Sequence, residues 1–278
     1  MDNSTKVRIL TALPLIPLVL GAIFYLPADL FALFFALIMM IAATEWANLS
    51  GLNKKTHHWM YAIVVTVSFL FPWTIIDSVN LLGIWLVLGC LGWFVWLAKI
   101  IRFTETETIT SRIMTIRLMQ GFWVLQVAWV SVMSMAKFSQ QGPILVMILL
   151  LLIWIADSGA YFSGRQWGKK KLAPLVSPGK SWEGVWGAVI FAVIYAVIVS
   201  QFINLNVMGQ VGFVILCFIV VAFSIVGDLT ESILKRNRGM KDSGKLLPGH
   251  GGMLDRIDSV LSAAPFFVLG LILLGLIQ

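Results

Sequence analysis

The chain has 278 residues, of which 59% are hydrophobic and only 12% charged, and its mean hydropathy is +0.93. A soluble globular protein is nearer half apolar and a quarter charged, so this composition excludes that class and predicts an integral membrane protein. The net charge of +7 is attributed to cytoplasmic loops beside anionic lipid, and no nucleic-acid partner is expected. Cys90 and Cys217 lie in apolar runs without a CxxC spacing, which indicates neither a disulfide framework nor a zinc site.

Nine apolar segments follow one another along the chain, and each must be helical in lipid, where no water satisfies the backbone. We therefore expect an all-α polytopic membrane protein with about nine transmembrane helices, folded as a single domain over 1–278. Residues 1–140 would supply the N-terminal helical spans, and residues 141–278 the spans and cytoplasmic loops that carry the chemistry. The nine segments are 9–26, 28–48, 59–76, 79–101, 118–137, 142–163, 182–204, 208–234 and 254–277.

The basic residues predict the orientation. With the N-terminus cytoplasmic and the C-terminus on the outer side, only Lys137 of the twenty Lys and Arg residues falls outside, as the positive-inside rule requires. A carboxylate in the bilayer is costly unless it is paired, so acids grouped at one level predict a shared polar cavity that opens inward. Seven acids lie at the cytoplasmic ends of apolar segments: Glu45, Asp157, Glu183, Asp228, Glu231, Asp255 and Asp258.

Two loops carry candidate phosphate-binding groups. In the first, 157–171, Arg165 and Lys169 supply positive charge; the alternative is a positive-inside tail behind a capping aspartate. In the second, Ser177–Gly184, a P-loop is excluded because Pro174 stands where that motif needs glycine. What remains is a turn that can cradle phosphate at a helix N-terminus, or, for Glu183, only a helix-start acid. The nucleotide-binding candidates are Arg165, Lys169, Ser177, Gly179, Lys180 and Ser181.

The densest cluster of charge lies between the last two apolar runs. Asp228, Glu231, Ser232 and Lys235 form one helical stripe, and the stripe Asp255, Asp258, Ser259 and Ser262 repeats its spacing on the next helix. The alternative is simple interhelical pairing, such as Asp228 with Arg256, which leaves the excess of acids unexplained. Carboxylates beside Lys and Arg are typical of Mg²⁺ that holds a polyphosphate. Asp228, Asp255, Asp258 and Glu231 are therefore the candidate metal ligands, and His250 is either a phosphate donor or a loop residue.

The run from Ser232 to Asp258 resembles the signature of the phosphatidate cytidylyltransferases, or CDP-diacylglycerol synthases. The loops 157–169 and 177–184 are also similar to that family, so the motifs cover roughly residues 145–278. Ser158 stands where many relatives have threonine. The matching positions are Ser232, Leu234 to Arg236, Lys241, Asp242, Gly244, Leu247, Pro248, His250 to Gly252, Asp255, Arg256 and Asp258.

The resemblance implies that CTP reacts with phosphatidic acid in the membrane to give CDP-diacylglycerol and pyrophosphate, with Mg²⁺. It places the metal on Asp228 and Asp255, with Asp258 and Glu231 beside them, and the family has been described with a second, monovalent cation. We expect a bacterial inner membrane and an active site that faces the cytoplasm, and a homodimer is left open. The implied catalytic set is Asp228, Asp255, Lys235, Arg236, Lys241, Asp242, His250 and Arg256.

Three other functions compete with this one. Intramembrane acids also mark the ion pathways of secondary transporters, but here they cluster at one face and no inverted repeat is visible. CDP-alcohol phosphotransferases use aspartates on helices, yet their aspartate-rich spacing is absent. A scaffold with a basic, lipid-binding surface gives no reason for two acidic stripes.

Overall fold

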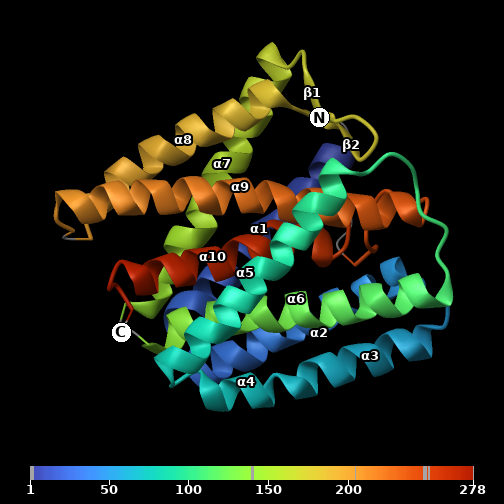
Figure 1. Ribbon diagram of the computed structural model, residues 1–278, viewed down its shortest axis with the longest axis horizontal. Coiled ribbons are helices and arrows are strands. Elements are labelled where there is room, and N and C mark those ends of the chain that lie inside the picture. Colours follow the sequence, from blue (N-terminus) through green and yellow to red (C-terminus); the bar gives the residue numbers. More distant parts are fainter. Residues whose placement is uncertain (1–2, 139–140, 204, 247–248, 250, 278) are drawn as a thin grey trace.

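A computed structural model describes the chain except residues 1–2, 139–140, 204, 247–248, 250 and 278. The described part folds into ten helices and one two-stranded hairpin (Figure 1). The strands, which pair antiparallel, are β1 (Lys171–Ala173) and β2 (Ser177–Ser181). The helices are α1 (Asn3–Tyr25), α2 (Ala28–Ser50), α3 (Lys55–Ser68), α4 (Leu70–Ile75), α5 (Val79–Ile101), α6 (Ser111–Phe138), α7 (Gly142–Trp167), α8 (Trp182–Ser200), α9 (Val207–Asn237) and α10 (Leu254–Leu273).

Within the described residues, seven helices are long and apolar enough to cross a membrane: α2 and α5 to α10. The class predicted from the sequence, an all-α polytopic membrane protein, is therefore confirmed, with a short hairpin added. In α1 the part whose side chains are described, Leu13–Tyr25, is an apolar helix shorter than a full span. Residues 59–76, expected as one span, are divided between α3 and α4 at Phe69, because Pro72 has no N–H to donate to the carbonyl of Ser68. The number of nine spans and the placement of the termini stay predictions.

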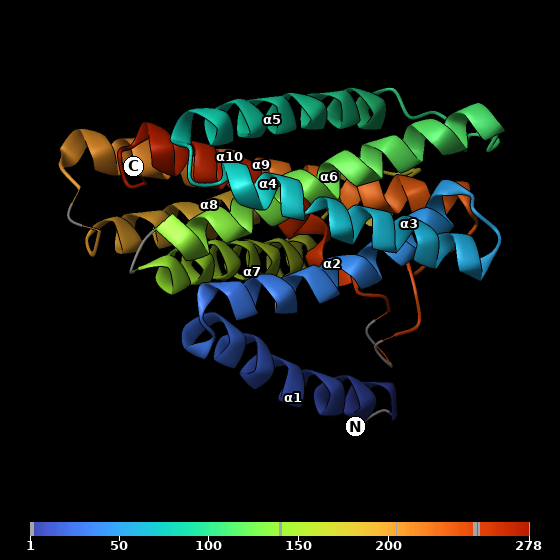
Figure 2. The same cartoon turned by 90° about the horizontal axis from the view of Figure 1, so that it is seen from below.

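The long helix α9 runs through the middle of the molecule (Figure 1). It packs against α10, which returns antiparallel beside it, and against α8 and α5. Helix α8 pairs along its length with α7, while α2, α3 and α6 form a second group that meets the first through α10. Helix α1 lies at the edge of the bundle, next to α2 (Figure 2). The core therefore surrounds α9 and α10, the two helices that carry the acidic stripes.

Small residues let α7 and α8 pack closely. A side chain at Gly187 of α8 would collide with the Ser163 side chain and the Gly159 carbonyl of α7. One at Gly184 would lie 3.0 Å from the carbonyl oxygen of Ala160. Apolar surface gives little drive for association in lipid, so close packing of small residues is what holds such helices together. This contact fixes the end of α7, the start of α8 and the hairpin between them.

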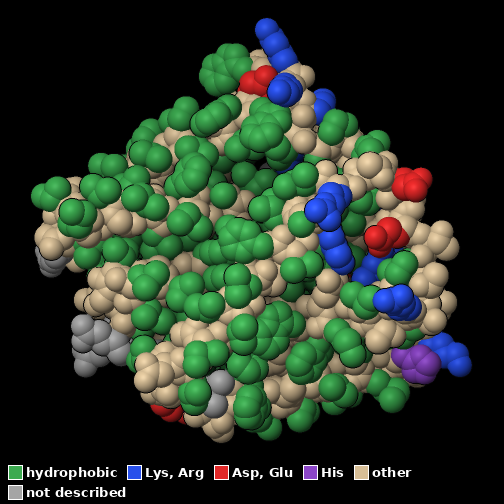
Figure 3. Space-filling view, viewed as in Figure 1, with side chains coloured by type: hydrophobic (Ala, Val, Ile, Leu, Met, Phe, Trp, Pro, Cys, Tyr) green, Lys and Arg blue, Asp and Glu red, His purple; other side chains and the backbone are tan. Residues whose placement is uncertain are grey.

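On the face shown in Figure 3 the surface is mostly apolar, as a lipid-facing surface must be, and most charged side chains lie along the right edge and at the top. At the other end of α6 from its Arg117, Lys137 Nζ lies 2.7 Å from Asp77 Oδ1 and 4.7 Å from the centre of the Trp73 ring. Large exposed apolar side chains include Leu33, Leu37, Val64, Leu70, Phe94, Ile190 and Ile215.

The α7–α8 contact predicts that Gly187→Ala destabilises the protein. The new methyl group would meet the backbone of Gly159, and overpacking of this kind costs about 1–3 kcal/mol. Thermal unfolding in detergent should show a midpoint lowered by several degrees. Gly83→Ala in α5 is the matched control, because its Cβ would meet no atom within 4 Å. Equal midpoints for the two variants would contradict the packing described here.

Candidate active site

The candidate active site lies where α9 and α10 come closest. A side chain at Gly227 would collide with the backbone carbonyl of Asp258, so the two helices touch almost backbone to backbone. Asp228 and Glu231 follow Gly227 on α9, and Asp255 precedes Asp258 by one turn on α10. The two acidic stripes, expected from the sequence to face one another, are brought together by this contact.

Lys235 links the two stripes. Its Nζ lies 2.8 Å from Glu231 Oε2 on the same helix and 2.6 Å from Asp255 Oδ1 on α10. The three side chains are only 13%, 2% and 8% exposed. Buried polar groups are tolerated when they are paired and hydrogen-bonded, so one ammonium group shared by two carboxyl groups joins α9 to α10 inside the bundle.

A third element, the strand β2, reaches the same place. Lys180 Nζ lies 2.6 Å from Asp228 Oδ2, and the Ser232 hydroxyl donates to Asp228 Oδ1 at 3.3 Å. Asp157 of α7 and Asp258 of α10 both lie within electrostatic range of Asp228 and Lys180. Four separate elements, α7, β2, α9 and α10, therefore contribute charged groups to one region.

The hairpin that presents Lys180 is anchored to α9. Val176, at its turn, packs on Leu229 and Ile233 of α9, and its carbonyl accepts a hydrogen bond of 3.1 Å from Arg236 Nε. The sequence predicted only a turn over 177–184; pairing with β1 makes its first part a strand. Arg236, predicted to be catalytic, holds the hairpin in the structure.

Acidic side chains outnumber basic ones in this region. Glu231 Oε1 is buried and has no hydrogen-bond partner among the described residues, which is an unfavourable state that a cation would relieve. Within the same residues, no three His, Cys, Asp or Glu side chains stand close enough to enclose a metal. Mg²⁺ does not require such a cluster, because it takes one or two carboxylates and fills its shell with water and phosphate oxygens. The carboxylates are Asp157, Asp228, Glu231, Asp255 and Asp258, and the ammonium groups are Lys180 and Lys235.

Glu45 of α2 is a residue of the site that the sequence grouped with the other acids but gave no role. Its buried carboxylate accepts hydrogen bonds from the Ser243 hydroxyl at 2.8 Å and from the backbone N–H groups of Met253 at 3.0 Å and Leu254 at 2.7 Å. It thus satisfies free amides at the start of α10, where the helix dipole also favours an anion. Its partners lie about two hundred residues away, so no local spacing could reveal them.

Asp255 ties the loop between α9 and α10 to the same point. Its Oδ2 accepts from the Ser243 backbone N–H at 2.9 Å and from the Gly252 N–H at 2.8 Å, and it lies 2.9 Å from the Ser243 hydroxyl. A side chain at Gly244 or Gly252 would collide with the Glu45 carboxylate. The glycines of this loop are therefore needed because the loop backbone runs directly over two acids.

The other predicted residues lie around this centre. Arg165 is exposed and donates to the Tyr161 hydroxyl at 3.0 Å, and Ser181 caps α8 by accepting from the Gly184 N–H at 3.2 Å. His250 lies outside the described residues. The rest are exposed or half-buried on the neighbouring loops and helix ends: Lys169, Ser177, Gly179, Lys241, Asp242 and Arg256.

Comparison with known proteins now settles the family. The model of the "Cytidylyltransferase family" matches residues 6–274. The chain belongs to the cytidylyltransferase family. The resemblance read from the motif at 232–258 is therefore confirmed, and it extends to the N-terminal half, where no motif was visible.

Curated relatives within this family are similar over almost the whole chain. The phosphatidate cytidylyltransferase of Pseudomonas aeruginosa is 40% identical over 262 residues, which cover 94% of this chain and 95% of that protein. The one from Haemophilus influenzae is 38% identical over 279 residues, covering 94% and 96%. The one from Thermotoga maritima is 42% identical over 128 residues, covering 45% and 47%.

The position of Glu45 predicts that Glu45→Gln loosens the loop before α10. Glutamine keeps the size but loses one acceptor oxygen and the charge, and each charge-assisted hydrogen bond contributes about 1.5–3 kcal/mol. Limited trypsin digestion should then cut faster at the exposed Lys241 and Lys245. Asp29→Asn, an exposed acid on the same helix, serves as control and should leave the cleavage rate unchanged. Equal rates for both variants would exclude the anchoring role of Glu45.

Proposed function

We propose that this protein transfers the cytidylyl group of CTP to phosphatidic acid and forms CDP-diacylglycerol and pyrophosphate. An oxygen of the lipid phosphate forms a bond to the α-phosphorus of CTP, and the bond from that phosphorus to the pyrophosphate oxygen breaks. The proposal is carried by the carboxylates of α7, α9 and α10 that meet Lys180 and Lys235 at one end of an apolar bundle. Relatives about 40% identical over nearly the full length are phosphatidate cytidylyltransferases.

The chemistry explains why charge is the main requirement. A phosphate monoester has its second pKa near about 6, so much of the lipid phosphate is a dianion at neutral pH and needs little help from a general base. The obstacle is the approach of this dianion to a nucleotide that is itself an anion. Neutralising charge and aligning the two phosphates are then the principal tasks of the site.

The residues fit Mg²⁺ as the cofactor. One or two of the acids Asp228, Asp255, Asp258 and Glu231 would hold it, and Glu231 Oε1 is a buried oxygen without a partner among the residues described. When bound, Mg²⁺ would neutralise and orient the phosphates of CTP. A second, monovalent cation, implied by the family resemblance, would find donors in the same excess of carboxylates.

The lysines have a complementary role. Lys180 pairs with Asp228, and Lys235 pairs with Glu231 and Asp255; an ammonium group is also a good donor to phosphate oxygens. Lys180 stands at the edge of the hairpin and is 26% exposed, whereas Lys235 is enclosed. We therefore assign Lys180 to the incoming phosphates and Lys235 to the alignment of the two helices. The exposed Arg165, Lys169 and Lys241 would attract the nucleotide.

We further propose that the site faces the cytoplasm from a bacterial inner membrane. CTP and pyrophosphate are soluble, while the lipid must stay in the leaflet, so the reaction needs a polar region at the inner ends of the helices. The basic residues around the site give the same orientation. With nine spans the N-terminus would be inside and the C-terminus outside.

Asp228→Asn and Asp255→Asn should each lower CTP turnover at least about a hundredfold, because each removes a carboxylate that would hold Mg²⁺ against the phosphates. Pyrophosphate release with phosphatidic acid in detergent measures this effect. Asp77→Asn, which breaks a pair with Lys137 at the far end of the bundle, should stay within about twofold of the wild type. Near-normal turnover of either site variant in excess Mg²⁺ would refute the metal assignment.

The orientation is tested by cysteine labelling of membrane vesicles. Cys90 and Cys217 are buried, so an added exposed cysteine gives the main signal. Lys171→Cys in the hairpin should react with a membrane-impermeant maleimide only in inverted vesicles. Gln201→Cys, between α8 and α9, should react only in right-side-out vesicles. The reverse pattern would invert the proposed topology and place the site on the outer face.

A further inference from the structure

A polar pocket lies on the other side of α9 from the candidate active site. It has a volume of about 440 Å³ and lies between the end of α5, the connection at 102–107, the first turns of α6, and α9. Its α9 wall is formed by Ile233 and Leu234. At about 100° per residue, these two side chains project away from the stripe of Asp228 and Lys235. The pocket is therefore distinct from the site proposed for the reaction.

Arg117 is the central residue of this pocket. Its side chain is only 3% exposed, and its Nη2 lies 2.9 Å from Glu107 Oε2. Its Nη1 is buried and has no hydrogen-bond partner among the described residues. A buried guanidinium that is only half paired is unfavourable, and its planar fork matches the oxygens of a phosphate group. The unpaired Nη1 of Arg117 therefore indicates that the pocket binds an anionic ligand.

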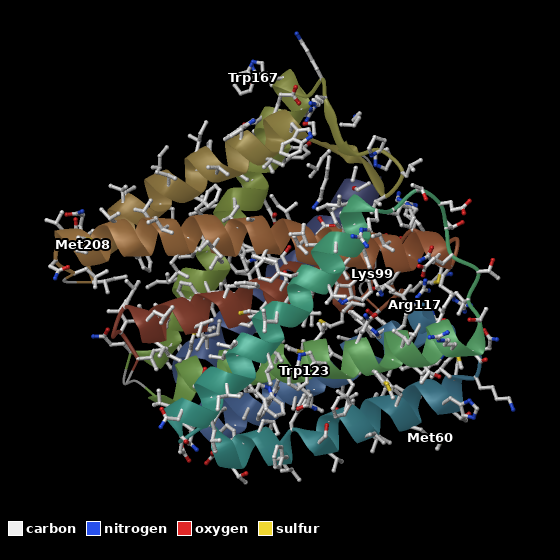
Figure 4. All side chains as sticks on the ribbon, in the orientation of Figure 1. Met60, Lys99, Arg117, Trp123, Trp167 and Met208 are labelled. Atoms are coloured by element: carbon white, nitrogen blue, oxygen red, sulfur yellow. The ribbon has the colours of Figure 1, made fainter. Side chains whose placement is uncertain are left out.

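Two further cations, Lys99 and Arg102, line the same pocket. Figure 4 shows Lys99 and Arg117 at one end of the molecule, where α5, α6 and α9 meet. Two acids, Glu105 and Glu107, also line it, and Glu107 is already engaged by Arg117. The pocket as a whole therefore keeps a positive charge.

The remaining wall of the pocket is apolar and continues into the outer surface of α5. Val95 and Trp96 line it, and Leu91, Phe94 and Ile101 are exposed on the same helix. An apolar helix face of this kind contacts lipid chains. A ligand with a phosphate at the polar end and hydrocarbon below it would satisfy both parts of the pocket.

We propose that this pocket binds a phosphate group through Arg117, Lys99 and Arg102, separately from the reaction site. The ligand is either the headgroup of an anionic membrane lipid or a free phosphate, since both present the same oxygens. The inference goes beyond the proposed reaction and does not depend on it.

Native mass spectrometry of the full-length protein in detergent tests the proposal. Phosphatidylglycerol is the probe, because it carries an anionic phosphate but lacks the phosphomonoester that the reaction uses; phosphatidylcholine is the zwitterionic comparison. We expect the wild type to retain phosphatidylglycerol in preference, and Arg117→Gln and Arg102→Gln to bind it at least tenfold more weakly. Arg112→Gln is the matched control, an exposed arginine of α6 that does not line the pocket, and should bind as the wild type does.

The outcomes separate the two sources. If millimolar inorganic phosphate displaces phosphatidylglycerol from the wild type but not from the weakened variants, the site accepts free phosphate as well as lipid. If it does not displace the lipid, the ligand is the lipid headgroup. Arg102→Gln changes an exposed side chain and keeps the test valid should Arg117→Gln fail to fold. Equal retention by Arg102→Gln and Arg112→Gln, with unchanged unfolding midpoints, would overturn the proposal.

Discussion

The structure depends on one constraint, the need to hold several charges inside an apolar bundle. Lys235 meets it by sharing a single ammonium group between Glu231 of its own helix and Asp255 of the next. Removing one partner from such a buried set leaves an uncompensated charge, which costs about 3–5 kcal/mol. The contacts that join α9 to α10 therefore also assemble the candidate site.

Two faces of helix α9 hold groups of the candidate site in place. One face carries Asp228, Glu231 and Lys235, while Leu229 and Ile233 on another face support the hairpin through Val176. Because Arg236 also binds the carbonyl of Val176, the hairpin is fixed to the helix whose acid it must reach. The anchored hairpin thus holds Lys180 beside Asp228. A loop without this anchorage would lose conformational entropy each time it closed over the site.

The sequence predicted the class, the family and most of the charged residues in the site, because those depend on local signals. Long apolar runs predict helices in lipid, and the repeated spacing of acids on the last two helices predicts that they meet. Contacts between distant segments could not be predicted from the sequence. Nothing local indicates that Lys180 would pair with Asp228, that Arg236 would hold a hairpin, or that Arg117 would be buried half paired. The division of 59–76 was also missed, although Pro72 was the signal for it.

The carboxylate of Glu45 has a consequence for how the protein is made. It belongs to an early transmembrane helix, yet its partners are Ser243, Met253 and Leu254. During synthesis these partners become available to Glu45 only when nearly the whole polypeptide has been translated. The N-terminal half is consequently more than a membrane anchor, since its Glu45 supplies the hydrogen-bond acceptors for the start of the last helix. A competent enzyme can exist only after the final segment has been inserted.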